Sequence, residues 1–311
     1  MDEIANSRLR KTLHKVLCVC GVLGSLMTSG CTTPPILAFG IVADVQYADK
    51  DKVGTRQYRR SMDKLVGAVS DFNDRKLAFV VQLGDIIDGG AGAEADLRTI
   101  ACLFNGIQTK KYHVLGNHDF SGIDRKTTMS ILGMKRAFYD FAYRKWRFVV
   151  LDTMDLAVAG GWDKDSLNYT LGKEMLDELA AAGKANAVEW NGAIGPAQKE
   201  WLEYILKDAQ AKKQKVIVFG HNPLMPAGDR YNLWNSGEIV KLLESYDGVV
   251  AYFNGHKHFC EYYWVNNKYY VTIDGMVEDA FDRGYAVANV YKDRIVIQST
   301  GKTPHLTLLL E

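Results

Sequence analysis

Cysteine is too scarce in most of this 311-residue chain to form a disulfide framework. Of the five cysteines, Cys18 and Cys20 lie in an apolar N-terminal stretch, and Cys31 closes it. Only Cys102 and Cys260 remain for the body, and nothing in the sequence places their Cα atoms within the short distance that a disulfide requires. The pattern excludes a small disulfide-stabilised scaffold and leaves open whether these two cysteines pair.

An excess of charge of either sign is also missing. The 38 lysines and arginines nearly cancel the 37 aspartates and glutamates, so no strong overall field favours nucleic acid or an acidic surface. Neutrality does not exclude a phosphate substrate, because bound cations can supply positive charge locally. The composition therefore predicts no nucleic-acid partner, and no protein partner is evident.

The N-terminal apolar run, Val16–Met27, is shorter than the roughly 20 apolar residues that a membrane-spanning helix needs. It follows four basic residues, which are Arg8, Arg10, Lys11 and Lys15. It ends in small residues that lead directly to Cys31, a pattern that predicts an export signal. The segment resembles a bacterial lipoprotein signal, except that Thr28 stands where that pattern usually has an aliphatic residue.

This resemblance implies that Cys31 is lipidated and that the protein is exported and anchored to a membrane, facing the periplasm or the cell exterior. Simple secretion with cleavage nearby and an uncleaved anchor remain as alternatives. The predicted organisation is a signal over residues 1–31, a tether over 32–35 and one domain over 36–311. A single domain is expected because the body shows no internal repeat, low-complexity segment or linker.

The body alternates short apolar runs with amphipathic stretches. The runs are rich in Val, Ile and Phe with little polar alternation, which predicts strands buried on both faces. They are Ile36–Ala43, Leu77–Leu83, Tyr112–Leu115, Trp146–Leu151, Val216–Phe219 and Val249–Phe253. Apolar residues at helical spacing predict helices over Tyr58–Phe72 and Pro196–Ala211. Strands that alternate with helices favour a layered α/β fold.

The C-terminal part instead predicts two hairpins, each around a short polar turn. Tyr262–Val265 and Tyr269–Ile273 flank Asn266-Asn267, and Tyr285–Tyr291 and Arg294–Gln298 flank Lys292-Asp293. We interpret these segments as antiparallel sheet, packed on the first sheet as a second one.

Polar side chains directly follow five of the predicted strands. They are Asp44 with Gln46, Asp85 with Asp88, Asn117-His118-Asp119, His221, and His256 with His258. In α/β sheets ligands gather beyond the carboxyl ends of the strands, so these groups are expected to converge. A glycine precedes the first such group in four of the five cases, where it lets the backbone bend sharply.

Taken singly, most of these groups have an ordinary structural interpretation. Asp44 could form a turn and His221 could be a hydrogen-bonded structural histidine. His256 and His258 are more specific, because side chains two residues apart in extended backbone point the same way and suit a metal. The joint occurrence in this order, which uses four of the seven histidines, favours a metal site.

In this order the motifs Asp-x-Gln, Gly-Asp-x-x-Asp, Gly-Asn-His-Asp, Gly-His and Gly-His-x-His resemble the calcineurin-like metallophosphoesterase signature. That signature normally begins Asp-x-His. With Gln46 in that place, the chain is similar to the manganese-dependent ADP-ribose/CDP-alcohol diphosphatase family. The segments Ala43–Asp49, Gln82–Gly89 and Asn191–Gly195 also resemble this family, whereas the segment after His258 departs from it.

The resemblance implies a layered α/β/β/α sandwich, with two mixed sheets flanked by helices. It also implies two divalent cations, one held by Asp44, Gln46, Asp85 and His258, and the other by Asp85, Asn117, His221 and His256. Asp85 would bridge the two ions, and a metal-bridging hydroxide would attack phosphorus. His118 would protonate the leaving oxygen with Asp88 orienting its ring, and Asp119 is interpreted as a structural turn residue.

Gln46 also bears on the identity of the metal. Its neutral amide oxygen replaces an imidazole, and harder oxygen ligands favour Mn²⁺ or Mg²⁺ over Zn²⁺. We therefore expect manganese, with magnesium, iron or mixed loading left open.

The resemblance implies cleavage of the phosphoanhydride bond of nucleoside diphosphate derivatives such as ADP-ribose or CDP-alcohols. Trp190 stands where related enzymes have an aromatic residue implicated in holding the base, although a packing role is equally open. Tyr47 and Arg59 are further candidates for substrate binding.

A broad-specificity phosphomonoesterase or phosphodiesterase is the alternative enzyme. A non-catalytic metal- or ligand-binding lipoprotein is less favoured, because it would not need His118.

Overall fold

The computed structural model describes residues 34–279, 283–300 and 304–310. The predicted signal and Cys31 lie outside the described residues, as do the first two residues of the predicted tether. Within the described part, no helix combines the length and the apolar character needed to cross a membrane.

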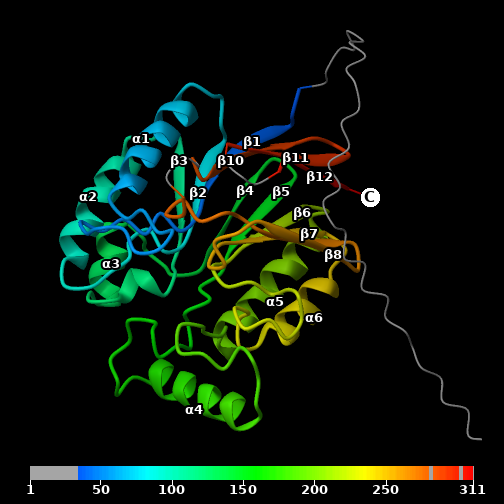
Figure 1. Cartoon of the computed structure of the whole chain (residues 1–311). Coiled ribbons are helices and arrows are strands. Elements are labelled where there is room, and N and C mark those ends of the chain that lie inside the picture. Colours follow the sequence, from blue (N-terminus) through cyan, green and yellow to red (C-terminus); the bar gives the residue numbers. More distant parts are fainter. Residues whose placement is uncertain (1–33, 280–282, 301–303, 311) are drawn as a thin grey trace, which may run out of the picture. The chain divides into compact units, whose positions relative to one another are not determined.

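Two six-stranded sheets form the centre of the domain (Figure 1). The first has the order β12 (Leu306–Leu309), β11 (Arg294–Ser299), β10 (Tyr285–Val290), β1 (Leu37–Val42), β2 (Phe79–Leu83) and β3 (Lys110–Val114). The second has the order β4 (Tyr139–Tyr143), β5 (Trp146–Val150), β6 (Lys215–Phe219), β7 (Val249–Asn254), β9 (Lys268–Thr272) and β8 (Glu261–Val265). Both are mixed, because antiparallel strands flank the parallel sets β1–β2–β3 and β5–β6–β7–β9.

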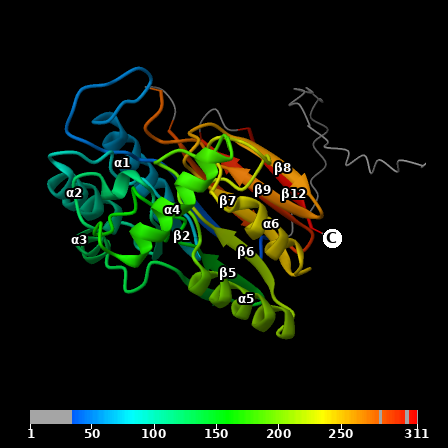
Figure 2. The same ribbon diagram turned by 90° about the horizontal axis from the view of Figure 1, so that it is seen from below.

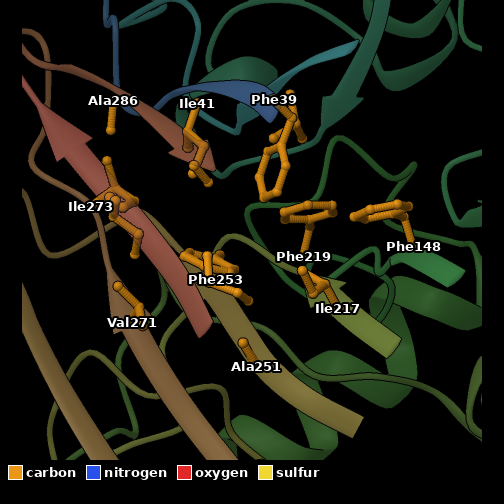
Figure 3. Close-up of a cluster of buried hydrophobic side chains, with 14 of the residues drawn as sticks. Phe39, Ile41, Phe148, Ile217, Phe219, Ala251, Phe253, Val271, Ile273 and Ala286 are labelled. Atoms are coloured by element: carbon orange, nitrogen blue, oxygen red, sulfur yellow. The ribbon is translucent and has the colours of Figure 1, made fainter. Parts of the chain in front are cut away.

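The alternation of side chains along each strand explains why the sheets pack face to face. In β1, Phe39 and Ile41 belong to the core between the sheets, whereas Val42 belongs to the cluster under the helices. Phe39 stacks on Phe79 with ring centroids 4.9 Å apart, and Phe148 of the second sheet meets Phe79 edge-on at 4.8 Å. Phe39 also meets Phe148 and Phe219 of the second sheet edge-on, each at 5.9 Å (Figure 3). Aromatic contacts of this kind add to the free energy gained by burying the rings.

Helices cover the outer face of each sheet (Figures 1 and 2). On the first sheet these are α1 (Arg60–Asn73), α2 (Ala93–Asn105) and α3 (Arg125–Ile131), after the short 3-10 turn η1 (His118–Phe120). On the second they are α5 (Pro196–Ala211) and α6 (Ser236–Glu244), and α4 (Leu167–Ala181) forms a small satellite cluster with Trp234. The predicted α/β/β/α sandwich is therefore confirmed.

The hairpins after β7 were predicted correctly, but their assignment to one further sheet was wrong. β8 and β9 join around Asn266 and Asn267, whose positive φ values of 48° and 61° suit a tight turn, and β9 pairs with β7. β10 instead pairs with β1, so the second hairpin extends the first sheet. Cys102 and Cys260 do not form a disulfide with each other.

Candidate metal centre

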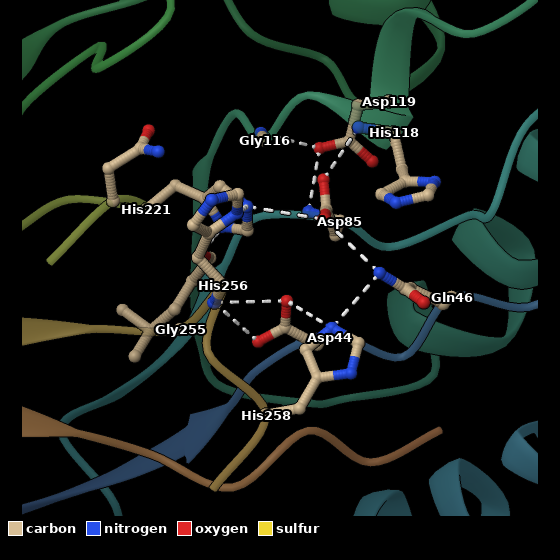
Figure 4. A network of polar contacts seen from close by, with 12 residues as sticks. Asp44, Gln46, Asp85, Gly116, His118, Asp119, His221, Gly255, His256 and His258 are labelled. Atoms are coloured by element: carbon tan, nitrogen blue, oxygen red, sulfur yellow. Dashed lines mark hydrogen bonds and ion pairs between the residues drawn. The ribbon is translucent and has the colours of Figure 1, made fainter. Parts of the chain in front are cut away.

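The predicted ligands gather where β1, β2, β3, β6 and β7 end, at one edge of the sandwich (Figure 4). This follows from topology, because the carboxyl ends of parallel strands meet at the same edge. Asp44, Gln46 and His221 are fully buried, and Asp85 is almost so. Carboxylates and imidazoles this deeply buried require charged or metal partners.

Asp85 lies at the centre of the group. Its Oδ2 lies 3.2 Å from Gln46 Nε2 and 3.2 Å from His221 Nε2. Its Oδ1 accepts a hydrogen bond from the backbone N–H of His118 at 2.8 Å. One carboxylate oxygen thus lies between two sets of polar groups, as a bridging ligand would.

Each side of Asp85 has its own cluster. On one side, His258 Nε2 lies 3.4 Å from Asp44 Oδ1 and 3.2 Å from Gln46 Nε2. On the other, His256 Nδ1 lies 3.0 Å from His221 Nε2. The ligand atoms of Asp85, His221 and His256 all fall within 4.8 Å of one another, which is close enough for a single cation. The geometry brings together the two sets that the sequence analysis assigned to two ions.

Two buried amide oxygens support the fit of cations here. Asn117 Oδ1 and Gln46 Oε1 have no hydrogen-bond partner among the described residues. An unpaired buried acceptor costs about 1–3 kcal/mol, and oxygen is the donor that Mn²⁺ and Mg²⁺ prefer. A half-turn of the Gln46 amide would direct its oxygen to the side of Asp85 and His258. The residues present therefore fit a dinuclear site.

Each histidine of the cluster has one ring nitrogen fixed by a second residue. His221 Nδ1 lies 2.8 Å from the Leu83 carbonyl, His256 Nε2 lies 3.1 Å from Asn191 Oδ1, and His258 Nδ1 lies 2.8 Å from Glu278 Oε1. The other nitrogen of each ring faces the cluster. Such outer partners set the ring orientation and the tautomer of metal-binding histidines.

The charges of the cluster shift the pKa values of its histidines. Burial disfavours a charged His221, but Asp85 outweighs it and raises the pKa of His221 to about 9. Asp44 raises the pKa of His258 to about 9 in the same way, again against burial. Burial and the charge of His221 hold the pKa of His256 well below its ordinary value. A cation that binds His221 and His258 must therefore displace protons.

The backbone at these positions is unusual. Asp44, Gln46, Asp85, His256 and His258 all have positive φ, between 39° and 70°. Residues other than glycine rarely adopt this region, and strained conformations of this kind concentrate at functional sites. Hydrogen bonds between the loops help to hold this backbone conformation, since both Asp44 carboxylate oxygens accept from the backbone N–H of His256, at 3.1 and 3.0 Å.

Glycines beside the ligands make room for their side chains. A Cβ at Gly116 would lie 2.6 Å from the backbone nitrogen of Asp85, and one at Gly255 would overlap the Asp44 carboxylate. A Cβ at Gly84 would lie 2.8 Å from Cγ of His221. Close approach of the loops, as well as backbone bending, thus requires glycine at these strand ends.

Asp119 is fully buried and connects the loops after β2 and β3. Its carboxylate accepts hydrogen bonds from the backbone N–H groups of Asp85 at 3.0 Å, Ile86 at 2.8 Å and Gly116 at 2.9 Å. Burial and the nearby charge of Asp85 raise the pKa of Asp119 to about 7. These contacts agree with the structural role expected from the sequence.

His118 lies beside the metal cluster and is partly exposed. Its Nδ1 lies 2.9 Å from the backbone carbonyl of Asp88 and 3.4 Å from the Asp88 carboxylate. Asp88 therefore orients the ring mainly through its main chain rather than through its side chain, which pairs with Lys50. The arrangement leaves His118 Nε2 for the cavity.

A cavity of about 490 Å³ opens over the cluster. It is lined by Gln46, Arg56, Asp85, Asn117, His118, Ser121, Ala159, Trp190, Arg230, Tyr231, His256 and His258. Trp190 packs against Tyr231 and His256 with ring centroids 5.2 and 5.1 Å away, and the Arg230 guanidinium lies 5.5 Å from the Trp190 ring. Trp190 and Tyr231 form an aromatic wall, and Arg230 lies beside both rings.

Two of the three predicted substrate contacts are not at this cavity. Tyr47 is buried in the hydrophobic cluster under the helices of the first sheet, and its backbone forms a bridge with Ile87. Arg59 points to solvent and pairs with Asp49 and Asp51. Of the three predicted substrate contacts, only Trp190 lines the cavity.

Sequence reasoning missed several residues of the site. Arg56, Arg230 and Tyr231 lie farther along the loops after β1 and β6 than the metal ligands do, and Glu278 follows β9, so no strand-end signal marks them. Asn191 begins the segment Asn191–Gly195, which resembles the diphosphatase family, but no local pattern indicates its contact with His256.

Comparisons with known proteins agree with this geometry. A family model described as calcineurin-like phosphoesterase matches residues 37–260. The chain is 33% identical to a manganese-dependent ADP-ribose/CDP-alcohol diphosphatase of Arabidopsis thaliana, over 72% of this chain and 80% of that protein. It is 30% identical to the protein of the same name from Xenopus laevis, over 88% of this chain and 90% of that one.

Solved structures give the same picture. A dimetal phosphatase from Danio rerio superposes with a TM-score of 0.82 at 28% identity, covering 89% of this chain and 100% of that chain. A purple acid phosphatase from Lupinus luteus, at 14% identity and a TM-score of 0.60, covers 90% of this chain and 55% of that chain and shares the fold.

Proposed function

Because the chain belongs to the calcineurin-like phosphoesterases, and among them to the manganese-dependent ADP-ribose/CDP-alcohol diphosphatases, we propose that it hydrolyses nucleoside diphosphate derivatives. ADP-ribose and CDP-alcohols are the substrates that we name first. The observation that carries the proposal is Asp85, whose carboxylate lies between two ligand clusters at the floor of the cavity.

The metal assignment follows the two clusters. Asp44, Gln46, Asp85 and His258 would hold one cation, and Asp85, Asn117, His221 and His256 the other, with manganese as the metal. When bound, two such ions neutralise phosphate oxygens and lower the pKa of a bound water.

The protein's own groups orient the substrate and transfer a proton. His118, fixed through Nδ1 by the Asp88 carbonyl, presents Nε2 to the cavity and can protonate the leaving oxygen there. The aromatic wall offers a face on which a nucleobase can stack. The cavity volume of about 490 Å³ falls within the usual range for a small-molecule ligand.

The alternative is a broad phosphomonoesterase or phosphodiesterase with the same metal site. A comparison of ADP-ribose, CDP-choline, AMP and an aryl phosphodiester in the presence of Mn²⁺ separates the two. We expect the highest kcat/KM for the diphosphates, and a clear preference for AMP would refute the diphosphatase assignment.

A third possibility, a non-catalytic binding protein, is tested with His118→Ala and Asp85→Ala. We expect both variants to lose turnover, and His118→Ala to retain Mn²⁺. Equal inactivity of wild type and both variants, with metal still bound, would refute the enzymatic assignment.

We also propose export through the N-terminal signal and lipidation at Cys31. The support is the basic, apolar and small-residue succession that ends at this cysteine. The test is mass spectrometry of the mature N-terminus, where a diacylglyceryl-modified Cys31 is expected. An unmodified Cys31 still joined to residues 1–30 would refute the proposal.

A further inference from the structure

Arg56 is the cationic side chain of the cavity wall that lies beside the proposed proton donor. Its guanidinium Nη1 lies 3.9 Å from Asp88 Oδ1, the oxygen that lies 3.4 Å from His118 Nδ1. Arg56 and His118 both line the cavity and share Asp88 as a neighbour. A ligand in this cavity therefore has both the His118 ring and the Arg56 side chain in the wall around it.

The backbone around Arg56 is held in place, although the residue lies in a loop. Its main chain exchanges hydrogen bonds with Val53 at 3.0 and 3.2 Å, and it forms a bridge with Glu278. The Glu278 side chain in turn contacts His258. The pairing of the loop after β1 with the segment before β10 thus places Arg56 on the His258 side of the cavity.

The guanidinium retains the capacity to bind an anion. Its contacts with Asp88 and Glu278, at 3.9 and 3.6 Å, are longer than the 2.7–2.9 Å or so of charge-assisted hydrogen bonds. The Arg56 side chain is 37% exposed, so it can turn toward a ligand. An arginine fork matches the oxygens of a phosphate in two parallel hydrogen bonds.

The aromatic wall lies at the other ligand cluster. Trp190 and Tyr231 contact His256, whereas Arg56 is linked to His258 through Glu278. The cavity thus has two aromatic rings, with Arg230 beside them, on the His256 side, and Arg56 on the His258 side. A nucleoside diphosphate derivative has the same asymmetry, with a base at one end and a second phosphate toward the other.

We propose that Arg56 binds the leaving phosphate and thereby selects diphosphates over esters whose leaving group is not a phosphate. The inference rests on the proposed function. In the reaction the oxygen of a water bonds to the phosphorus at the metal cluster, and the bridging P–O bond breaks. The electron pair of that bond stays on the bridging oxygen, which accepts the proton of His118. The water loses one proton to solvent, and His118 takes up a proton from solvent again. The products are two phosphate monoesters, and Arg56 binds the one that leaves.

The test compares leaving groups in the wild-type enzyme, Arg56→Gln and Arg56→Lys. Substrates are ADP-ribose and CDP-choline, which release a phosphate monoester, and bis(p-nitrophenyl) phosphate, which releases a phenol. We expect Arg56→Gln to lower kcat/KM for both diphosphates about 10- to 100-fold, the usual range for a charge-assisted contact, with less than a threefold change for the aryl diester. Arg56→Lys retains the charge and should recover part of the loss.

Arg98→Gln is the matched control, because Arg98 is 62% exposed on α2 and pairs only with Glu94 among the described residues. It should leave all three rates unchanged. Mn²⁺ binding, measured by electron paramagnetic resonance, should be the same in wild type and Arg56→Gln. Weaker binding would mean that Arg56 acts by holding Glu278 and His258, and would overturn the proposal.

The remaining outcomes are also decisive. An equal loss for diphosphates and aryl diester, or no loss for either, would refute the role of Arg56. Failure of the wild-type enzyme to cleave either diphosphate, while it cleaves the aryl diester, would instead refute the proposed function.

Discussion

Replacing Asp119 by alanine tests whether one buried carboxylate holds the metal-binding loops together. The substitution removes the hydrogen bonds from the N–H groups of Asp85, Ile86 and Gly116, at 3.0, 2.8 and 2.9 Å. It leaves those three donors buried behind a methyl group. The loops after β2 and β3 carry Asp85 and Asn117, so both stability and metal binding should suffer.

The magnitude follows from the number of bonds. A hydrogen bond to a charged group contributes about 1.5–3 kcal/mol, and the desolvation of the buried carboxylate offsets part of the sum. We expect the free energy of unfolding to fall by about 3–5 kcal/mol, close to the cost of breaking a buried charged network. At roughly 2–4 °C per kcal/mol for a large domain, the melting temperature should fall by about 10 °C.

The assay is thermal unfolding in the presence of a chelator, because bound metal would itself stabilise the folded state. A separate titration should show weaker Mn²⁺ binding. Asp124→Ala is the control, since Asp124 is an exposed cap that accepts from the Thr127 N–H at 2.9 Å, and its loss should cost about 1 kcal/mol. If Asp119→Ala melts at the same temperature as Asp124→Ala and binds Mn²⁺ as tightly as the wild type, Asp119 does not hold the two loops together.

Three further predictions concern the cavity floor. His118→Ala should lower kcat about 10²- to 10⁴-fold for a poor leaving group and much less for p-nitrophenolate, because only the poor leaving group needs the proton; steady-state kinetics with both substrates decides. Gly116→Ala should abolish Mn²⁺ binding, since its Cβ would lie 2.6 Å from the Asp85 nitrogen, whereas Gly67→Ala on α1, where nothing lies within 4 Å, should bind normally in the same calorimetric titration. Mn²⁺ affinity should rise with pH up to about 9 and then level off. His221 and His258, with pKa values raised to about 9, are protonated below that pH and must lose their protons before they can bind the metal. An affinity that stays constant between about pH 6 and pH 9 would contradict these values.

The central strands and the ligand motifs could be predicted from the sequence because both are local. A run such as Val216–Phe219 specifies a buried strand through its own composition, and the glycine and histidine that follow mark its end. β6 indeed covers Lys215–Phe219, and α5 has the predicted bounds, Pro196–Ala211. The structure also contains elements that were not predicted, which are α2, α3, α4, α6, β4 and β12. Of these, α3, β4 and β12 have only four to seven residues, too few for a clear periodicity, and α4 buries only Gly172 and Leu176.

The assignment of strands to sheets was not local. The two C-terminal hairpins look alike in sequence, yet one pairs with β7 and the other with β1. Hydrogen bonds between main chains carry no residue-specific signal. The packing of the whole core therefore decides which edge strand of a sheet each hairpin pairs with. The same reason explains why the prediction for Tyr47 differs from the structure. Its position near Asp44 in the sequence suggested that it lines the cavity, but its ring is buried in the hydrophobic core.

The order and type of the metal ligands were thus determined by the sequence itself, because each is fixed to the end of its own strand. Only the tertiary structure decided which residues surround them. Glu278 meets His258, Asn191 meets His256, and Arg56 meets the neighbourhood of His118 because two sheets and their loops close on one another. These contacts join residues far apart along the chain, so packing, rather than any local pattern, places Arg56 and the aromatic wall in one cavity over the metal centre.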